Sequence, residues 1–109
     1  VLTGYEFNVV LLNYYRHGQD SVAWHADDEA ELGRNPVIAS VTLGAERPFQ
    51  FRHKHDKTMS RHRFILGDGS ILLMGETIQN NWMHQLPKVR SCDQPRLNLT
   101  FRRIAVPDT

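Results

Sequence analysis

The sequence predicts an all-β domain, and three observations support this class. Short runs rich in β-branched and aromatic residues recur roughly every ten residues. Turn residues, such as the tripeptide Gly67–Gly69, separate these runs. No segment carries a sustained helical period of hydrophobic residues. An antiparallel barrel or sandwich follows, of which a jelly roll is one form.

Eight strands are expected, and in chain order they cover Phe7–Tyr15, Ser21–His25, Val37–Leu43, Pro48–His53, Arg61–Leu66, Ser70–Met74, Trp82–Leu86 and Arg96–Ile104. The first is apolar and aromatic and ends at the polar turn His17–Asp20, and the second is a short run after that turn. The third follows the turn Gly33–Pro36 and ends at Gly44. The fourth alternates, which places Phe49 and Phe51 on one face.

The other four strands follow the same logic. The fifth and sixth flank Gly67–Gly69, a tripeptide typical of hairpin turns, and the seventh is a short apolar run. In the eighth, polar and apolar residues alternate from Arg96 to Arg102, which predicts a half-buried strand with one polar face. Little helix is expected beyond single turns at Asp28–Leu32 and Thr77–Asn81.

Length and composition exclude membrane-spanning and disulfide-rich proteins. The 109 residues, 40% of them hydrophobic, suit one domain, which we expect to occupy residues 1–109. No apolar run is long enough to span a membrane, and no signal peptide is visible at the N-terminus. The single cysteine, Cys92, excludes an internal disulfide framework and a multi-cysteine zinc site. We expect an intracellular protein, in the cytoplasm of a bacterium or the nucleus of a eukaryote.

The net charge of +1 conceals an asymmetry. One segment has six basic residues against a single acid, and these six are Arg47, Arg52, Lys54, Lys57, Arg61 and Arg63. Acidic residues concentrate between Asp20 and Glu31. The basic segment suits a polyanion and the acidic one a cation or a positively charged substrate, although charge alone favours two solvated surfaces.

Three residues suggest a metal centre. His25 and Asp27 lie two positions apart and therefore share one face of a strand. His84 lies within the apolar run Trp82–Leu86. Two histidines and one carboxylate on adjacent strands can form the facial triad of non-haem Fe(II) oxygenases. The spacing alone is weak support, because chance pairs are common in a chain with six histidines.

The polar face of the last strand suggests an anion site. It carries two arginines, an amide and a hydroxyl, from Arg96, Asn98, Thr100 and Arg102. Burying such a face is costly without an anionic partner, and the arginine fork suits a carboxylate. A small dicarboxylate beside a metal is one interpretation, and an exposed edge strand is the other.

The order of these motifs resembles the AlkB family of Fe(II)/2-oxoglutarate dioxygenases, in the branch of the human homologues 2 and 3. The resemblance extends from about Phe7 to Arg103, and its segments are Asn13–Tyr15, His25–Glu29, Pro36–Ser40, Leu66–Ser70, His84 and the Arg96-x-Asn98-x-Thr100-x-Arg102 strand. It implies a double-stranded β-helix, or jelly roll, of about eight strands. It also implies Fe(II), 2-oxoglutarate and O2 as cofactor and co-substrates.

The resemblance assigns roles residue by residue. The iron ligands, and hence the catalytic residues, are His25, Asp27 and His84. The 2-oxoglutarate site comprises Arg96, which pairs with the distal carboxylate, together with Asn13, Tyr15, Asn98, Thr100 and Arg102. Glu29 and His25 belong to the pocket for the methylated base. Bases such as 1-methyladenine and 3-methylcytosine are cationic, so the carboxylate of Glu29 favours the damaged base.

The implied reaction is oxidative demethylation of N-alkylated bases in DNA or RNA, with decarboxylation of 2-oxoglutarate to succinate and release of formaldehyde. We expect a monomer that binds alkylated nucleic acid and no membrane, and whose six basic residues contact phosphates. We also expect residues 1–109 to be a catalytic core without the N-terminal substrate lid of the family. Two alternatives stay open: a 2-oxoglutarate-dependent hydroxylase of a protein or small molecule, and a non-catalytic jelly-roll module that binds nucleic acid.

Overall fold

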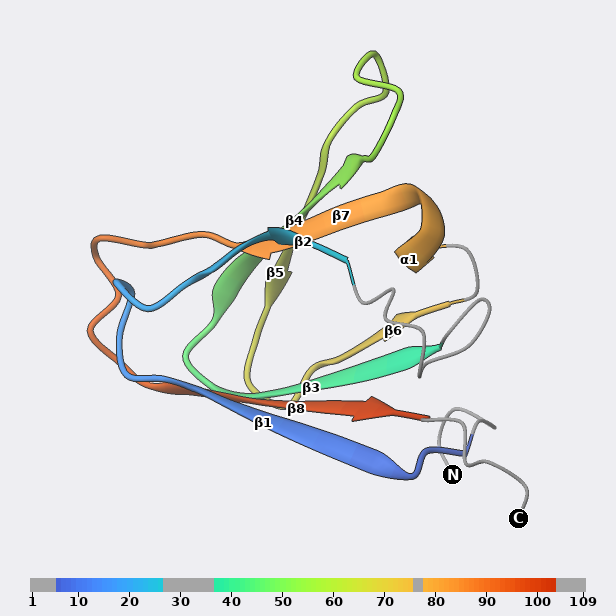
Figure 1. Cartoon of the computed structure of the whole chain (residues 1–109). Helices are drawn as coiled ribbons and strands as arrows, with labels where there is room; N and C mark the ends of the chain where they lie inside the picture. The colour runs from blue at the N-terminus through green and yellow to red at the C-terminus, as the bar shows by residue number, and fades with distance from the viewer. Residues whose placement is uncertain (1–5, 27–36, 76–77, 104–109) are drawn as a thin grey trace.

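The computed structural model describes residues 6–26, 37–75 and 78–103, which form two antiparallel four-stranded sheets (Figure 1). The first sheet has the order β1 (Val9–Tyr15), β8 (Arg96–Arg102), β3 (Ile38–Gly44) and β6 (Ile71–Met74). The second has the order β2 (Val22–His25), β7 (Trp82–Leu86), β4 (Arg47–His53) and β5 (His62–Leu66). This two-sheet arrangement is a jelly roll, so the predicted all-β class is confirmed.

Each predicted strand appears with small shifts at its ends. The strand expected from Phe7 begins at Val9, and the one expected from Pro48 begins at Arg47. The single turn expected at Thr77–Asn81 is α1 (Ile78–Asn81), whereas the one expected at Asp28–Leu32 lies outside the described residues. In the described part of the chain, no helix is long and apolar enough to cross a bilayer.

Strand β8 is an interior strand of the first sheet, and the burial of its residues shows which way its polar face points. It pairs with β1 on one side and β3 on the other, so that Asn98 lies opposite both Asn13 and Thr42. Along β8, buried residues alternate with partly buried ones, and the buried positions are the polar ones, beginning with Arg96. The polar face is therefore turned between the two sheets, and the exposed-edge interpretation is wrong.

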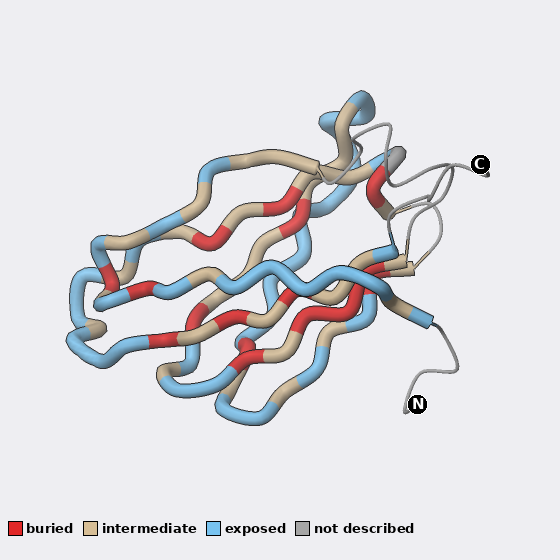
Figure 2. Tube along the Cα trace, turned by 60° about the horizontal axis from the view of Figure 1, so that its bottom comes forward, coloured by how far each residue is buried: buried red, intermediate tan, exposed pale blue. Residues whose placement is uncertain are grey.

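The space between the sheets is only partly apolar. Ile38, Phe51 and Met74 form the buried hydrophobic cluster, which lies where β3, β4 and β6 approach one another. The buried polar or charged residues in the described part of the chain are Ser40, Thr42, Arg47, Gln79, His84, Arg96, Asn98 and Thr100. Figure 2 shows the buried stretches along the interior strands, and the exposed ones at the loops and along the edge strands β1 and β5. Since unpaired polar groups are costly to bury, an interior of this kind indicates a ligand site.

One end of the jelly roll is closed by the β1–β2 and β7–β8 connections. The Gly18 N–H donates to the Cys92 carbonyl at 2.8 Å, and the Val89 N–H donates to the Gly18 carbonyl at 2.8 Å. A Cβ atom on residue 18 would lie 1.7 Å from the Val89 carbonyl oxygen. Only glycine lets the two backbones come this close.

We expect Gly18→Ala to lower the free energy of unfolding by about 2–3 kcal/mol, because the added methyl group forces the two connections apart. Chemical denaturation measures the change. Gly67→Ala is the matched control, since the nearest atom to its Cβ is 4.0 Å away, and it should cost less than about 0.5 kcal/mol. Equal stability of the two variants would contradict the close approach at Gly18.

Candidate active site

A cavity of about 140 Å³ lies between the sheets and brings together most of the residues predicted to form a site. It is lined by Leu11, Asn13, Tyr15, Val22, His25, Ser40, Phe49, Met74, His84, Leu86, Arg96, Asn98, Thr100 and Arg102. Thus all six residues predicted for the 2-oxoglutarate site and both predicted histidine ligands face one cavity. Asp27 and Glu29 lie outside the described residues.

Arg96 lies at the closed end of the cavity and is only 2% exposed. Its Nη2 donates to Thr42 Oγ1 at 2.9 Å, and its Cζ lies 5.3 Å from the centre of the Tyr15 ring. Burial lowers the pKa of Arg96 and raises the pKa of Tyr15, which keeps its phenol protonated. Among the described residues, no carboxylate pairs with Arg96 and its Nε has no hydrogen-bond partner. A buried guanidinium of this kind fits the carboxylate of a ligand.

Asn98 and Thr100 continue the same wall with a connected set of hydrogen bonds. Asn98 Nδ2 donates to Ser40 Oγ at 2.6 Å and to the Val41 carbonyl at 3.2 Å. Thr100 Oγ1 donates to Asn98 Oδ1 at 2.8 Å. These bonds satisfy the amide and fix its orientation, so a ligand in the cavity meets a rigid wall.

The two histidines come from neighbouring strands of the second sheet. His25 of β2 lies opposite His84 of β7 in the strand register, and their ring centres are 4.3 Å apart. Phe49 and Phe51 of β4 pack on His84, with ring centres 5.2 and 5.9 Å away. The strand pairing therefore places two imidazoles side by side on the inner wall.

Both imidazoles can offer a ring nitrogen to a metal. His25 Nδ1 is 2.7 Å from the Ala23 carbonyl, which can only accept, so Nδ1 donates to it and Nε2 is the nitrogen available to a metal. Burial, with smaller effects of His25 and Arg102, lowers the pKa of His84 to about 3. His84 is therefore neutral near pH 7 and can donate a lone pair.

This donor set fits a 2-His-1-carboxylate metal site. The two histidines need one carboxylate to complete the triad, and Asp27 follows His25 by two residues. Because Asp27 lies outside the described residues, its role stays a prediction. No cluster of three His, Cys, Asp or Glu occurs within the described ranges. A jelly roll whose cavity holds two adjacent imidazoles and a buried arginine is typical of the class of non-haem Fe(II) oxygenases that use a carboxylate co-substrate.

Comparisons with known proteins agree with this class. The family model described as the 2OG-Fe(II) oxygenase superfamily matches residues 1–102, and the chain belongs to this superfamily. As the name of the superfamily states, its cofactor is Fe(II) and its co-substrate is 2-oxoglutarate, with O2 as the oxidant.

The chain is also similar to individual AlkB proteins. It is 44% identical over 109 residues to the alpha-ketoglutarate-dependent dioxygenase alkB homolog 3 of Homo sapiens, a match covering 94% of this chain and 38% of that protein. It is 43% identical over 109 residues to the DNA oxidative demethylase ALKBH2 of Homo sapiens, covering 94% and 42% respectively. The chain thus spans about two fifths of these relatives. These matches confirm the predicted AlkB resemblance.

A solved structure supports the fold. The structure of OsALKBH1 superimposes with a TM-score of 0.69 at 20% sequence identity, and the match covers 91% of this chain and 49% of that one. At this level of identity, the superposition supports the jelly-roll fold and no statement about the site.

Of the six basic residues predicted to contact phosphates, Arg47 is buried and the other five are accessible. Arg47 was expected to contact phosphate, but its side chain is 0% exposed, because it lies at the start of β4 where the two end connections cover it. The other five remain accessible and surround the β4–β5 hairpin, which projects from the body of Figure 1. They are Arg52, Lys54, Lys57, Arg61 and Arg63. Arg52, Lys54, Lys57 and Arg61 also line a surface hollow of about 310 Å³.

Sequence reasoning missed the residues that support the site from β3. Ser40 holds Asn98, and Thr42 holds Arg96. A signal was present, because these two hydroxyl residues alternate with apolar ones in the otherwise apolar run from Ile38 to Leu43.

We expect Arg96→Ala to weaken 2-oxoglutarate binding roughly 10- to 150-fold, since losing a charge-assisted pair costs about 1.5–3 kcal/mol. Calorimetric titration of the Mn(II)-loaded protein measures the affinity. Arg103→Ala is the matched control, because this neighbouring arginine has a side chain that is 63% exposed. Unchanged affinity in Arg96→Ala would refute its role.

Proposed function

We propose that this chain is the catalytic core of an enzyme that oxidatively demethylates N-alkylated nucleobases. One observation carries the proposal: a single cavity holds two adjacent imidazoles and a buried arginine that lacks a carboxylate partner among the described residues. The relatives named as a DNA oxidative demethylase and as alkB homologues support the substrate class.

The metal and the co-substrate would be held by opposite walls of the cavity. His25 and His84 on the second sheet, with Asp27, would ligate Fe(II). Arg96 on the first sheet would bind the distal carboxylate of 2-oxoglutarate, beside Tyr15. Asn13, Asn98, Thr100 and Arg102 complete this wall. When bound, Fe(II) with 2-oxoglutarate and O2 supplies the oxidation that removes the methyl group as formaldehyde and leaves succinate and CO2.

The chain's own residues would contribute binding, orientation and exclusion of water. The carbonyl of Ala23 holds the His25 ring in one tautomer, and Phe49 and Phe51 shield His84 from solvent. Arg102 brings a further positive charge to the cavity. Glu29 would favour a cationic methylated base over a neutral one. The base must leave its stack to reach the metal.

The accessible basic residues around the β4–β5 hairpin would contact the phosphates of the nucleic acid. They gather at one projecting element, and Arg52 and Arg61 are ordered against the Trp24 ring, with Cζ atoms 4.5 and 5.7 Å from its centre. Stacking pre-orients their guanidinium groups and lowers the entropy cost of binding. With such a substrate, we further propose an intracellular monomer, located in the cytoplasm of a bacterium or the nucleus of a eukaryote.

The protein, supplied with Fe(II), 2-oxoglutarate and O2, should release formaldehyde from single-stranded DNA that contains 3-methylcytosine. His25→Ala should release none, because the metal loses one of its ligands. Mass spectrometry of the oligonucleotide and a formaldehyde assay measure the two products.

The other outcomes of this assay separate the alternatives. Succinate production with intact methyl groups and no binding to the oligonucleotide would favour a hydroxylase of a protein or small molecule. If the unaltered chain does not bind Fe(II) and His25→Ala has the same Fe(II) affinity, the result would favour the non-catalytic module that binds nucleic acid.

Replacing Lys57, Arg61 and Arg63 by Gln should weaken binding to single-stranded DNA and reduce the slope of log K against log salt by about 0.7 for each phosphate that is no longer neutralised. Fluorescence anisotropy at several salt concentrations gives the slope. Lys88→Gln with Arg90→Gln is the control pair, since both residues lie on the β7–β8 connection, away from the hairpin. A similar slope change in the control would mean that the hairpin has no special role.

A further inference from the structure

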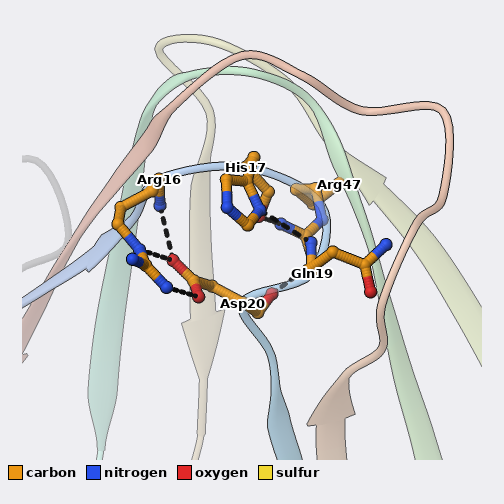
Figure 3. A network of polar contacts seen from close by, with 5 residues as sticks. All are labelled: Arg16, His17, Gln19, Asp20 and Arg47. Atoms are coloured by element: carbon orange, nitrogen blue, oxygen red, sulfur yellow. Dashed lines mark hydrogen bonds and ion pairs between the residues drawn. The ribbon is translucent and has the colours of Figure 1, made fainter.

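Arg47 is a buried arginine that the proposed function does not use. Its side chain is 0% exposed, and its hydrogen bonds to backbone carbonyls tie it to two loops. Nη2 donates to Asp20 O at 2.9 Å, and Nη1 donates to His17 O at 3.3 Å (Figure 3). Nη2 also donates to Pro87 O at 2.8 Å. These carbonyls belong to the β1–β2 and β7–β8 connections, so one guanidinium joins both connections at the closed end.

The same guanidinium lies behind the co-substrate wall. Its Cζ is 5.8 Å from the centre of the Tyr15 ring, and the Cζ of Arg96 is 5.3 Å from the centre of that ring. Tyr15 ends β1 directly opposite Arg96, and both line the cavity. Arg47 does not line it. Any effect of Arg47 on a ligand therefore passes through Tyr15 or through its charge.

The nearby carboxylate does not neutralise Arg47. Asp20 is engaged by Arg16, whose backbone N–H and Nε donate to Oδ2 at 2.8 and 2.9 Å and whose Nη2 donates to Oδ1 at 2.9 Å (Figure 3). This fork holds the pKa of Asp20 well below its usual range. Asp20 thus gives its carboxylate to Arg16 and only its carbonyl to Arg47.

Two positive charges are therefore buried near each other at this end of the cavity. No described carboxylate forms an ion pair with Arg47 or Arg96, and neither Nε has a hydrogen-bond partner among the described residues. The Arg47 charge reaches its neighbours, since it lowers the pKa of Arg96 further after the larger effect of burial. In a low-dielectric interior such a pair favours an anion placed between the sheets.

We propose that Arg47 is a positioning and specificity residue for the co-substrate: it holds Tyr15 against Arg96, and its charge makes the cavity prefer a dianionic 2-oxo acid over a monoanionic one. The inference rests on the proposed 2-oxoglutarate site. It adds a residue outside the cavity that affects ligand selectivity. The hydrogen-bond acceptors of this residue are neutral carbonyls, so they leave its positive charge uncompensated.

The test compares two ligands that differ only at the distal end. 2-Oxoglutarate carries a carboxylate there, and 2-oxopentanoate carries a methyl group. The ratio of their dissociation constants, measured by calorimetry on the Mn(II)-loaded chain, reports the recognition of the distal charge. A change in overall stability alone does not move this ratio.

Three variants separate charge from structure. Arg47→Gln keeps an amide that can donate to the carbonyls but removes the charge, and should reduce the preference for 2-oxoglutarate about tenfold. Arg47→Lys keeps the charge and should hold the ratio within about twofold of that of the unaltered chain. Arg16→Gln loosens the same turn from outside, and should lower the melting temperature without changing the ratio.

An unchanged ratio in Arg47→Gln would overturn the inference and leave Arg47 a purely structural residue. If Arg47→Gln does not fold, Arg47→Lys decides, because a tenfold fall in its ratio would show that the preference does not follow the charge. Failure of the proposed function looks different: the unaltered chain would then show no preference between the two acids.

Discussion

The hydrogen bond from Arg96 to Thr42 ties a charged side chain of β8 to β3 inside the molecule, and the site is arranged around it. Burying a guanidinium between two sheets is costly, and the described residues offer it no carboxylate. The jelly roll tolerates this cost because the surrounding strands supply hydroxyl and amide partners, while an anionic ligand can supply the rest. The interior is consequently a polar cavity suited to a ligand rather than a continuous apolar core.

The two sheets divide the chemistry between them. The first presents arginines and hydrogen-bonding side chains from β8 and β3, and the second presents imidazoles from β2 and β7. This division places the arginines and hydrogen-bonding side chains on one wall of the cavity and the imidazoles on the other, as the proposed binding of an anion and a metal requires. It also explains why the end connections matter, since Arg47 and Gly18 hold together the loops that join the two sheets at the Arg96 end.

Much of this could be predicted from the sequence. The eight strands follow from short β-rich runs between turn residues, and the alternation from Arg96 to Arg102 assigns four polar residues to one face. The motif order indicated the family. The prediction for Arg47 was wrong because a basic residue within a basic segment is ordinarily expected on the surface. Its burial depends on hydrogen bonds to the carbonyls of His17, Asp20 and Pro87, which are distant in the sequence.

The sequence by itself determined the strand pattern, the residue types of the site and their grouping on shared faces, because local alternation and turn chemistry act over a few neighbouring residues. Only the tertiary structure decided that β8 is an interior strand, that His25 lies opposite His84, and that Arg47 is enclosed at the closed end. The physical reason is that strand order and register depend on contacts between distant segments. In another strand order the same polar strand could lie at an exposed edge of the sheet. In the observed order it lines the cavity between the two sheets.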